Sequence, residues 1–314
     1  MRLFFTDKLT QLANNFSGSP TAIRALFLLL FVDFIWASST GITLQNLDPG
    51  LAAAMLPLVI AMLIDATGYA KRIAHIAHDL ALWWLSFPLF GIFTYLCATL
   101  SFPLMDTHFS NINVALGFDW VAWNRYVTNH FYLNNFLDAV YKSPLYQTYF
   151  AVLFFSHSKR RSGAHELWFT TVISLLITSM VSTVLPALGT FFYYKENLEA
   201  AIHIPNLFAL RDGTLITFQI LSLRPIITFP SFHMVLALLL CYPYRHYKKI
   251  FPLILLLNFL MMLSIPSHGG HYLVDMMGGL VVACVSIILY HKLMQFKSLI
   301  FDRRAGALLV VGNT

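Results

Sequence analysis

The 314-residue sequence predicts an all-α integral membrane protein with about eight transmembrane helices. Hydrophobic residues make up 58% of the chain and charged residues only 11%, whereas a soluble domain carries roughly 25% charged residues. A spanning segment is a helix of about 20 mostly apolar residues, because the hydrocarbon layer is roughly 30 Å thick and no backbone group can stay unpaired in it. Stretches of this kind recur from one end of the sequence to the other.

Eight apolar runs separated by polar breaks are the expected helices. They are residues 25–44, 51–68, 79–101, 139–157, 165–191, 231–244, 249–266 and 271–292. The sixth run is short for a full crossing. Asp33 lies inside the first run, where an ionisable group is costly, so we expect it to pair with a polar group on another helix.

The basic residues predict the orientation of these helices. Most of the 20 Lys and Arg residues lie in the N-terminal segment, in the breaks after the second, fourth and sixth runs, and in the C-terminal segment. The positive-inside rule places these parts, and both termini, in the cytoplasm. The net charge of +6 is therefore interpreted as a topology signal, which argues against a nucleic-acid partner.

Two long segments, 106–138 and 194–229, then lie on the outer face, which is periplasmic, extracellular or luminal for a plasma or inner membrane protein. In the first, Trp120, Trp123, Val127 and Phe131 recur at near-helical spacing among polar residues. Aromatic residues with polar neighbours favour the headgroup zone. This pattern predicts an interfacial helix lying on the membrane.

Two short segments carry the residue types of a reactive site, each where an outer loop becomes a helix: 229–233 and 266–275. His271 and Asp275 are spaced i, i+4 and so share one helical face. A carboxylate beside an imidazole fixes its tautomer, which leaves the other ring nitrogen as a nucleophile or base. His233 begins another helix at the same level and could protonate a leaving group. Ser231 lies at that helix start, where free amides bind anions.

Pro-Ser-x-His at 230–233, followed by His-x3-Asp at 271–275, resembles the type 2 phosphatidic acid phosphatase superfamily. The His-Tyr-x-x-Asp form of the second motif is similar to the lipid phosphotransferase branch, which includes inositol phosphorylceramide synthase and the sphingomyelin synthases. The resemblance covers about residues 79–292. It implies a six-helix catalytic core at 79–292, after an N-terminal cytoplasmic segment with two added transmembrane helices at 1–78 and before a cytoplasmic tail at 293–314.

The resemblance implies a phosphohistidine mechanism at the outer face. His271 would attack phosphorus, Asp275 would orient it, and His233 would donate a proton to the departing alcohol. The donor would be a lipid phosphate or phospholipid in the bilayer, and water or an alcohol would accept the phosphoryl group. We expect transfer to an alcohol; the alternative is hydrolysis of a lipid phosphate or pyrophosphate by the same residues.

The sequence departs from the phosphatase pattern at two cation positions, where Thr217 and Ile265 stand instead of Lys and Arg. Phosphoryl transfer needs its negative charge neutralised. Arg211 and Arg224 are therefore the expected phosphate-binding cations, with Ser231 and His268 assisting. The missing phosphatase arginine favours transfer over simple hydrolysis.

Two other classes of function fit the sequence less well. The histidines and Asp275 are also metal-ligand types, but neither a zinc-protease motif nor clustered cysteines accompany them, so we expect no metal and no cofactor. A transporter or lipid-binding protein should place polar groups near mid-membrane. The later runs carry almost no charge at their centres, and the ionisable cluster lies at their outer ends, which favours an enzyme.

Overall fold

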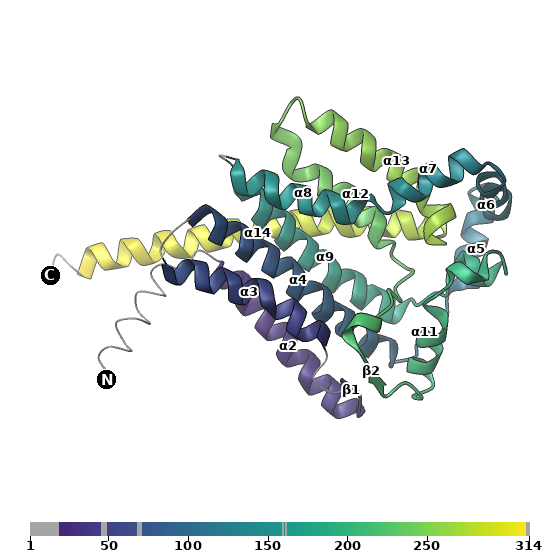
Figure 1. Cartoon of the computed structure of the whole chain (residues 1–314), viewed down its shortest axis with the longest axis horizontal. Helices are drawn as coiled ribbons and strands as arrows, with labels where there is room; N and C mark the ends of the chain where they lie inside the picture. The colour runs from purple at the N-terminus through teal and green to yellow at the C-terminus, as the bar shows by residue number, and fades with distance from the viewer. Residues whose placement is uncertain (1–18, 45–48, 68–70, 159, 161, 312–314) are drawn as a thin grey trace.

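The fold is a bundle of long helices with a cap of short helices at one end (Figure 1). The computed structural model describes residues 19–44, 49–67, 71–158, 160 and 162–311. The bundle helices are α2 (Pro20–Thr40), α3 (Pro49–Thr67), α4 (Lys71–Ala98), α8 (Ser143–His157), α9 (Ser162–Val184), α12 (Phe232–Cys241), α13 (Phe251–Gly269) and α14 (Leu273–Val311). The cap holds α5 (Asp106–Ala115), α6 (Trp120–Asn129), α7 (Phe131–Tyr141), α10 (Thr190–Tyr193) and α11 (Ile204–Arg211).

The helices confirm the all-α membrane fold class. Within the described ranges, α2, α4, α9, α13 and α14 are long and apolar enough to cross a membrane. The other three expected spans are also helical, as α3, α8 and α12. The sixth span is short, since α12 has 10 residues and continues as a 3-10 turn, η3 (Tyr242–His246). Large exposed side chains on α2, such as Phe27, Leu28 and Phe34, suit a lipid-facing surface.

The segment from 106 to 138 forms three helices where one was expected. Gly117 has a φ of +73° after the end of α5, and the Asp119 carboxylate caps α6 by accepting from the Ala122 amide at 2.9 Å. The non-helical backbone of His130, with φ −107° and ψ 89°, then separates α6 from α7. Trp120 and Val127 are buried in the protein, whereas Phe131 is 69% exposed, so the near-helical spacing reflects packing of α6 against the bundle.

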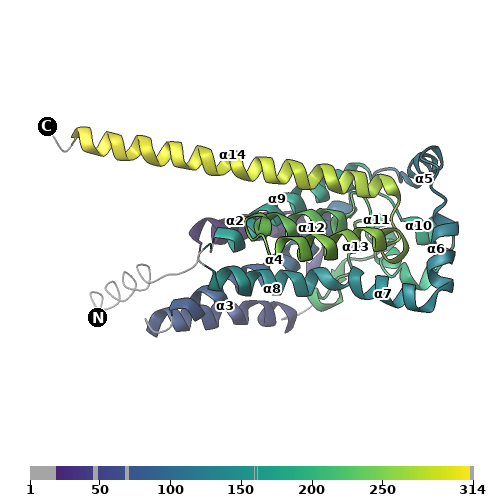
Figure 2. The ribbon, with the colours of Figure 1, turned by 90° about the horizontal axis from the view of Figure 1, so that it is seen from above.

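The core fills the space between α4, α8, α9, α12 and α14. Trp168 of α9 donates from its indole nitrogen to the Ser86 hydroxyl of α4 at 3.0 Å. Figure 2 shows α14 running along one face of the bundle and extending beyond it, away from the cap. At the end of the bundle away from the cap, Arg245 donates to both carboxylate oxygens of Glu166, at 2.9 and 2.8 Å.

Asp33 does not pair as expected. Its side chain is 2% exposed, and neither carboxyl oxygen has a hydrogen-bond partner among the described residues. By contrast, Asp65 of α3 lies 2.7 Å from His78 of α4 and joins the two helices.

A two-residue strand pair joins the N-terminal helices to the loop before the first motif. β1 (Thr43–Leu44) runs parallel to β2 (Thr217–Phe218), and Thr43 pairs with Thr217. The Thr43 amide donates to the Ile216 carbonyl at 2.8 Å. The expected domain boundary between residues 78 and 79 falls inside α4.

Candidate active site

The two sequence motifs meet at the cap end of the bundle. The Ser231 amide donates to the Asp275 carbonyl at 2.9 Å, which joins the start of α12 to the first turn of α14. A Cβ on Gly279 would lie 2.5 Å from the Ser231 carbonyl oxygen, so only glycine allows this approach. The helix starts predicted from the sequence are therefore in direct contact.

His271 contacts Asp275, although it lies in the turn before α14 and not on the helical face that the i, i+4 spacing predicts. The distance from His271 Nδ1 to Asp275 Oδ2 is 3.1 Å, and the same oxygen accepts from the Tyr272 amide at 2.9 Å. His271 is 4% exposed and Asp275 is fully buried. In the tautomer that donates Nδ1–H to Asp275, the ring lone pair is on Nε2, the nitrogen that could then attack.

The burial of His271 also sets its protonation. Loss of hydration lowers the pKa of His271 to about 4, and a hydrogen bond with the Thr228 backbone opposes this shift. Burial disfavours the charged form of a base. The imidazole is therefore neutral at neutral pH, which is the form a nucleophile needs.

Tyr141, at the end of α7, contacts His233. Its hydroxyl lies 3.1 Å from His233 Nδ1, and the two rings stack with centroids 4.0 Å apart. A Cβ on Gly269 would lie 2.9 Å from the Tyr141 hydroxyl and 3.2 Å from His271 Nε2. The hydroxyl is thus close to both histidines, and burial raises the pKa of Tyr141 above its usual range, so it stays a neutral phenol.

We expect Tyr141→Phe to lower kcat about 5- to 10-fold, which corresponds to the net contribution of one neutral hydrogen bond. The stacked ring is kept, so KM for the donor should stay within about twofold. The pH dependence of kcat should also change, because the hydroxyl group that contacts His233 Nδ1 is lost. Tyr146→Phe is the matched control, since Tyr146 is 71% exposed on α8. An unchanged kcat and pH profile would show that Tyr141 does not position His233.

Asp106 fixes the loop that supports His271. Its carboxylate accepts from the Leu188 and Gly189 amides at 2.9 and 3.0 Å and from the Tyr272 hydroxyl at 3.0 Å. The Thr190 amide donates to the Gly270 carbonyl at 2.8 Å. The loop after α9 therefore holds the turn that carries His271.

Several further polar groups surround these residues. Ser231 is fully buried, and its hydroxyl has no partner among the described residues. His268 Nδ1 lies 3.1 Å from the Ser267 hydroxyl, and its ring centroid is 6.2 Å from that of Tyr141. His203 Nε2 lies 3.0 Å from the Leu188 carbonyl oxygen. Burial lowers the pKa of His203, and nearby His271 acts in the same direction.

The two arginines expected to bind phosphate make their contacts elsewhere. Arg211 Nη2 donates to the Phe102 carbonyl at 2.8 Å and to the Ser101 carbonyl at 3.4 Å. Arg224 is exposed, and its amide donates to the Tyr95 hydroxyl at 2.9 Å. In the described part of the chain, neither guanidinium hydrogen-bonds a residue of either motif. The described residues also include no group of three His, Cys, Asp or Glu side chains that could hold a metal ion.

Tyr141, Asp106 and His203 were not predicted from the sequence. Each is a single residue in a cap segment, with no fixed spacing to either motif. The one available signal was the position of Asp106 at the start of an outer segment.

Comparison with known proteins identifies the family of the chain. A family model described as the PAP2 superfamily matches residues 107–289. Searches of curated proteins and of solved structures gave no match. The matched region covers more than half of the chain and contains both motifs. The chain therefore belongs to the PAP2 superfamily, the superfamily of the type 2 phosphatidic acid phosphatases.

Proposed function

We propose that this protein is a membrane lipid phosphotransferase that works through a phosphohistidine on His271. Its superfamily contains phosphatases and phosphotransferases that act on lipid phosphates. The observation that carries the proposal is the pair formed by buried His271 and Asp275, 3.1 Å apart, beside the pair formed by His233 and Tyr141, 3.1 Å apart. One pair supplies an oriented nucleophile and the other supplies a proton carrier.

In the first half of the reaction, His271 Nε2 attacks phosphorus and the bond to the leaving alcohol breaks. His233 gives its Nε2 proton to the departing oxygen, while its Nδ1 contacts the Tyr141 hydroxyl. In the second half, an acceptor hydroxyl gives its proton to His233 as its oxygen bonds phosphorus. The P–N bond breaks, and His271 regains its lone pair.

The start of α12 is our candidate for the phosphate cradle. The first amides of a helix have no partner within the helix and attract anions. Ser231 precedes them, and its buried hydroxyl is unpaired among the described residues. His268 and Arg224 stay candidates for the remaining charge, since His268 is close to Tyr141 and Arg224 is exposed.

Transfer rather than hydrolysis is supported by the burial of the nucleophile. His271 is 4% exposed, and a site that excludes water protects a reactive intermediate from it. Hydrolysis by the same residues is the second candidate. The basic residues near the ends of the chain and after the second, fourth and sixth apolar runs support an active site on the outer face.

The test is a reconstituted assay with the full chain in liposomes. A panel of phospholipids and lipid phosphates labelled at phosphorus is offered with and without hydroxyl-bearing lipids. The expected result is acid-labile label on the protein and more labelled lipid product than free phosphate. More free phosphate than lipid product would favour the hydrolase. Absence of labelled protein and of any product across the panel would contradict both.

The pKa of His271 predicts the acid side of the pH profile. Because this pKa is lowered to about 4, the neutral nucleophile persists as pH falls through the usual histidine range near 6.5. We expect phosphoenzyme formation under single-turnover conditions to be lost only as pH approaches about 4. The measurement is the rate of protein labelling between pH 4 and 8 with a donor whose phosphate does not titrate there. Loss centred near 6.5 would contradict a buried, neutral His271.

A further inference from the structure

A surface cavity that the candidate mechanism does not use lies where α2 and α4 end. Its volume is about 430 Å³, which is within the usual range of small-molecule sites. Its walls come from the last turn of α2, the residues after α4, and the segment between the end of α11 and β2. The polar and aromatic side chains in the lining are Trp36, Thr40, Thr99, Arg211 and Asp212.

This cavity lies at the level of the lipid headgroups. Both α2 and α4 are long and apolar enough to cross a membrane, and a spanning helix ends near the edge of the hydrocarbon layer. Trp36 is one turn before the end of α2, and tryptophan is enriched at this level. The two residues before it, Phe34 and Ile35, are 69% and 51% exposed. Acyl chains can therefore lie along α2 while a lipid head occupies the cavity.

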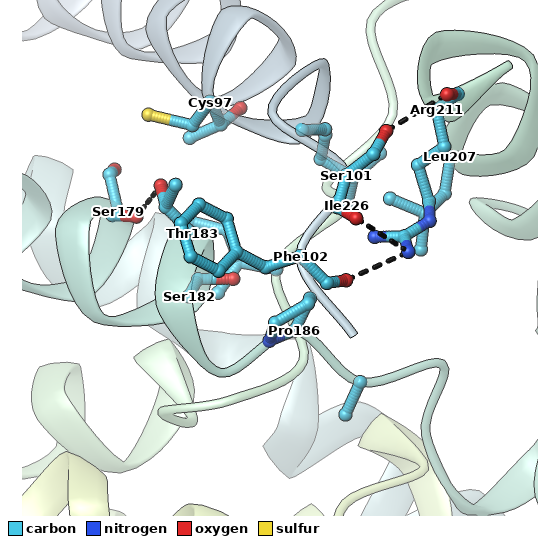
Figure 3. Close-up of a pocket in the computed structure, with 14 residues that line it drawn as sticks. Cys97, Ser101, Phe102, Ser179, Ser182, Thr183, Pro186, Leu207, Arg211 and Ile226 are labelled. Carbon is cyan, nitrogen blue, oxygen red and sulfur yellow. Dashed lines mark hydrogen bonds between the residues drawn. The ribbon is translucent and has the colours of Figure 1, made fainter. Parts of the chain in front are cut away.

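Two opposite charges line the cavity without pairing with each other in the described part of the chain. Figure 3 shows the Arg211 side chain turned towards residues 101 and 102, where Nη2 donates to both backbone carbonyls. Asp212 is exposed, and its Oδ1 accepts from the Thr214 hydroxyl at 2.6 Å and the Thr214 amide at 3.0 Å. The bond from the Thr214 hydroxyl lowers the pKa of Asp212 below its usual range. A ligand with one positive and one negative group would match both charges.

The other polar groups of the lining are suited to a positive group that donates hydrogen bonds. Thr40 donates its hydroxyl proton to the Trp36 carbonyl at 3.1 Å, and Thr99 donates to the Leu96 carbonyl at 2.7 Å. The lone pairs of both hydroxyl oxygens therefore stay available to a ligand. The Asp212 carboxylate also accepts, and the face of an indole ring attracts cations. A primary ammonium group, which carries three N–H donors, fits this set.

The guanidinium of Arg211 is suited to a phosphate group. It carries five N–H donors, and those on Nε and Nη1 have no hydrogen-bond partner among the described residues. Arginine binds phosphate oxygens through paired N–H groups of this kind. A phosphoethanolamine head carries a phosphate and a primary ammonium group two carbon atoms apart. It can therefore bind Arg211 and the neighbouring Asp212 together.

We propose that this cavity binds the phosphoethanolamine head of a phospholipid. The ammonium group contacts Asp212, Trp36 and the threonine oxygens, and the phosphate contacts Arg211. No residue of either sequence motif lines the cavity, so this lipid is not the one whose phosphorus reacts with His271. The inference goes beyond the proposed function and does not depend on it.

The bound lipid would strengthen the junction between the N-terminal helices and the rest of the chain. The cavity is formed on one side by α2 and on the other by the segment that leads into β2. The strand pair of Thr43 and Thr217 joins the same two parts. A lipid head that contacts both sides therefore stabilises the folded protein.

The test is thermal unfolding of the purified full chain in detergent, titrated with dihexanoyl phospholipids. Phosphatidylethanolamine supplies both charges and the N–H donors, phosphatidylcholine lacks the N–H donors, and phosphatidylglycerol lacks the cation. Soluble glycerophosphoethanolamine presents the head without acyl chains. A ligand that binds the folded protein raises the unfolding midpoint as its concentration increases, which gives an apparent Kd.

Two cavity variants are each compared with a matched control. Asp212→Asn removes the charge and keeps an oxygen that can accept from Thr214. Its control is Asp119→Asn, because Asp119 is also an exposed aspartate that accepts from a backbone amide. Trp36→Leu removes the indole ring from the cavity. Its control is Trp84→Leu, because Trp84 is 43% exposed on α4 and outside the cavity lining.

We expect phosphatidylethanolamine to raise the unfolding midpoint most. Each cavity variant should raise its apparent Kd about 5- to 10-fold, which corresponds to the net contribution of one hydrogen bond, and the controls should match the unaltered protein. Equal binding of phosphatidylcholine or phosphatidylglycerol would overturn the proposal. An unchanged Kd in Asp212→Asn would also overturn it, because the lipid would then bind elsewhere.

Glycerophosphoethanolamine should bind more weakly than the lipid, because it lacks the acyl chains that lie along α2. Equal apparent Kd values for the two would overturn the assignment to a lipid. Binding is measured without turnover, so failure of His271 to form a phosphohistidine would contradict the proposed function and leave this result intact.

Discussion

Replacing His271 by glutamine is expected to reduce turnover of the donor by more than about 1,000-fold and to abolish acid-labile labelling of the protein. Removal of a covalent nucleophile leaves only the rate enhancement from binding and electrostatics. Glutamine keeps a polar side chain of similar length, so the packing around Asp275 changes little. The measurements are single-turnover labelling and steady-state transfer at saturating donor.

His157→Gln is the matched control for this substitution. His157 is exposed at the end of α8 far from Tyr141, and its ring contacts only the Leu153 carbonyl in the described part of the chain. Its replacement should leave both rates within about twofold of the unaltered protein, as expected for an exposed position. Labelling of the His271→Gln variant at the normal rate would show that another residue is the nucleophile.

Asp275→Asn is expected to lower phosphohistidine formation on the order of 100- to 10,000-fold while leaving donor KM nearly unchanged. Asp275 Oδ2 faces both His271 Nδ1 and the Tyr272 amide. An asparagine oxygen in the Oδ2 position can still accept from both donors, but it is neutral and no longer stabilises the positive charge that forms on His271 when Nε2 bonds phosphorus. If the NH₂ group faces Nδ1, it selects the tautomer whose Nε2 carries the proton and cannot attack.

Loss of folding must be separated from loss of chemistry in this variant, because Asp275 is fully buried. The thermal unfolding midpoint in detergent and retention of donor binding test the fold. Asp119→Asn is the control, since Asp119 is an exposed N-cap of α6 and asparagine caps helices equally well. A folded Asp275→Asn protein with normal labelling would contradict an orienting role for the carboxylate.

The sequence was sufficient to predict the parts of the site that follow from local spacing. His271 and Asp275 are four residues apart in the sequence, and His233 follows a helix-start signal. His271 lies in the turn before α14, so its contact with Asp275 depends on this short separation and on the turn at Gly270, not on a shared helical face. The hydrogen bond between the Ser231 amide and the Asp275 carbonyl could not be predicted, because it depends on how closely α12 and α14 pack at Gly279.

Residues of the cap were harder to place. The spacing of Trp120 and Val127 indicates an amphipathic helix equally well whether its apolar face meets lipid or protein, and here it meets protein. Trp120 donates from its indole to the Pro266 carbonyl at 2.8 Å, a contact across 146 residues that no local pattern encodes. Tyr141 reaches His233, and Asp106 reaches the loop beside His271, through the same arrangement of α5, α6 and α7.

Charge alone was also insufficient to assign the arginines. The sequence shows only that Arg211 and Arg224 are cations in the outer segment before the first motif. The structure turns the guanidinium of Arg211 towards the carbonyls of residues 101 and 102. A long flexible side chain can point in several directions from one backbone position, and only the packed neighbours decide between them.

The short strand pair between Thr43 and Thr217 has a consequence for protein engineering. The N-terminal helices and the loop that leads to Ser231 are connected through this pair, and residue 78 lies within the continuous helix α4. A truncation at residue 78 would cut a helix and remove the partner strand at once, so its loss of activity would say little about the core. A chimaera that exchanges α2 and α3 between relatives should have its junction between α3 and α4, and residues 216–218 should be exchanged along with them.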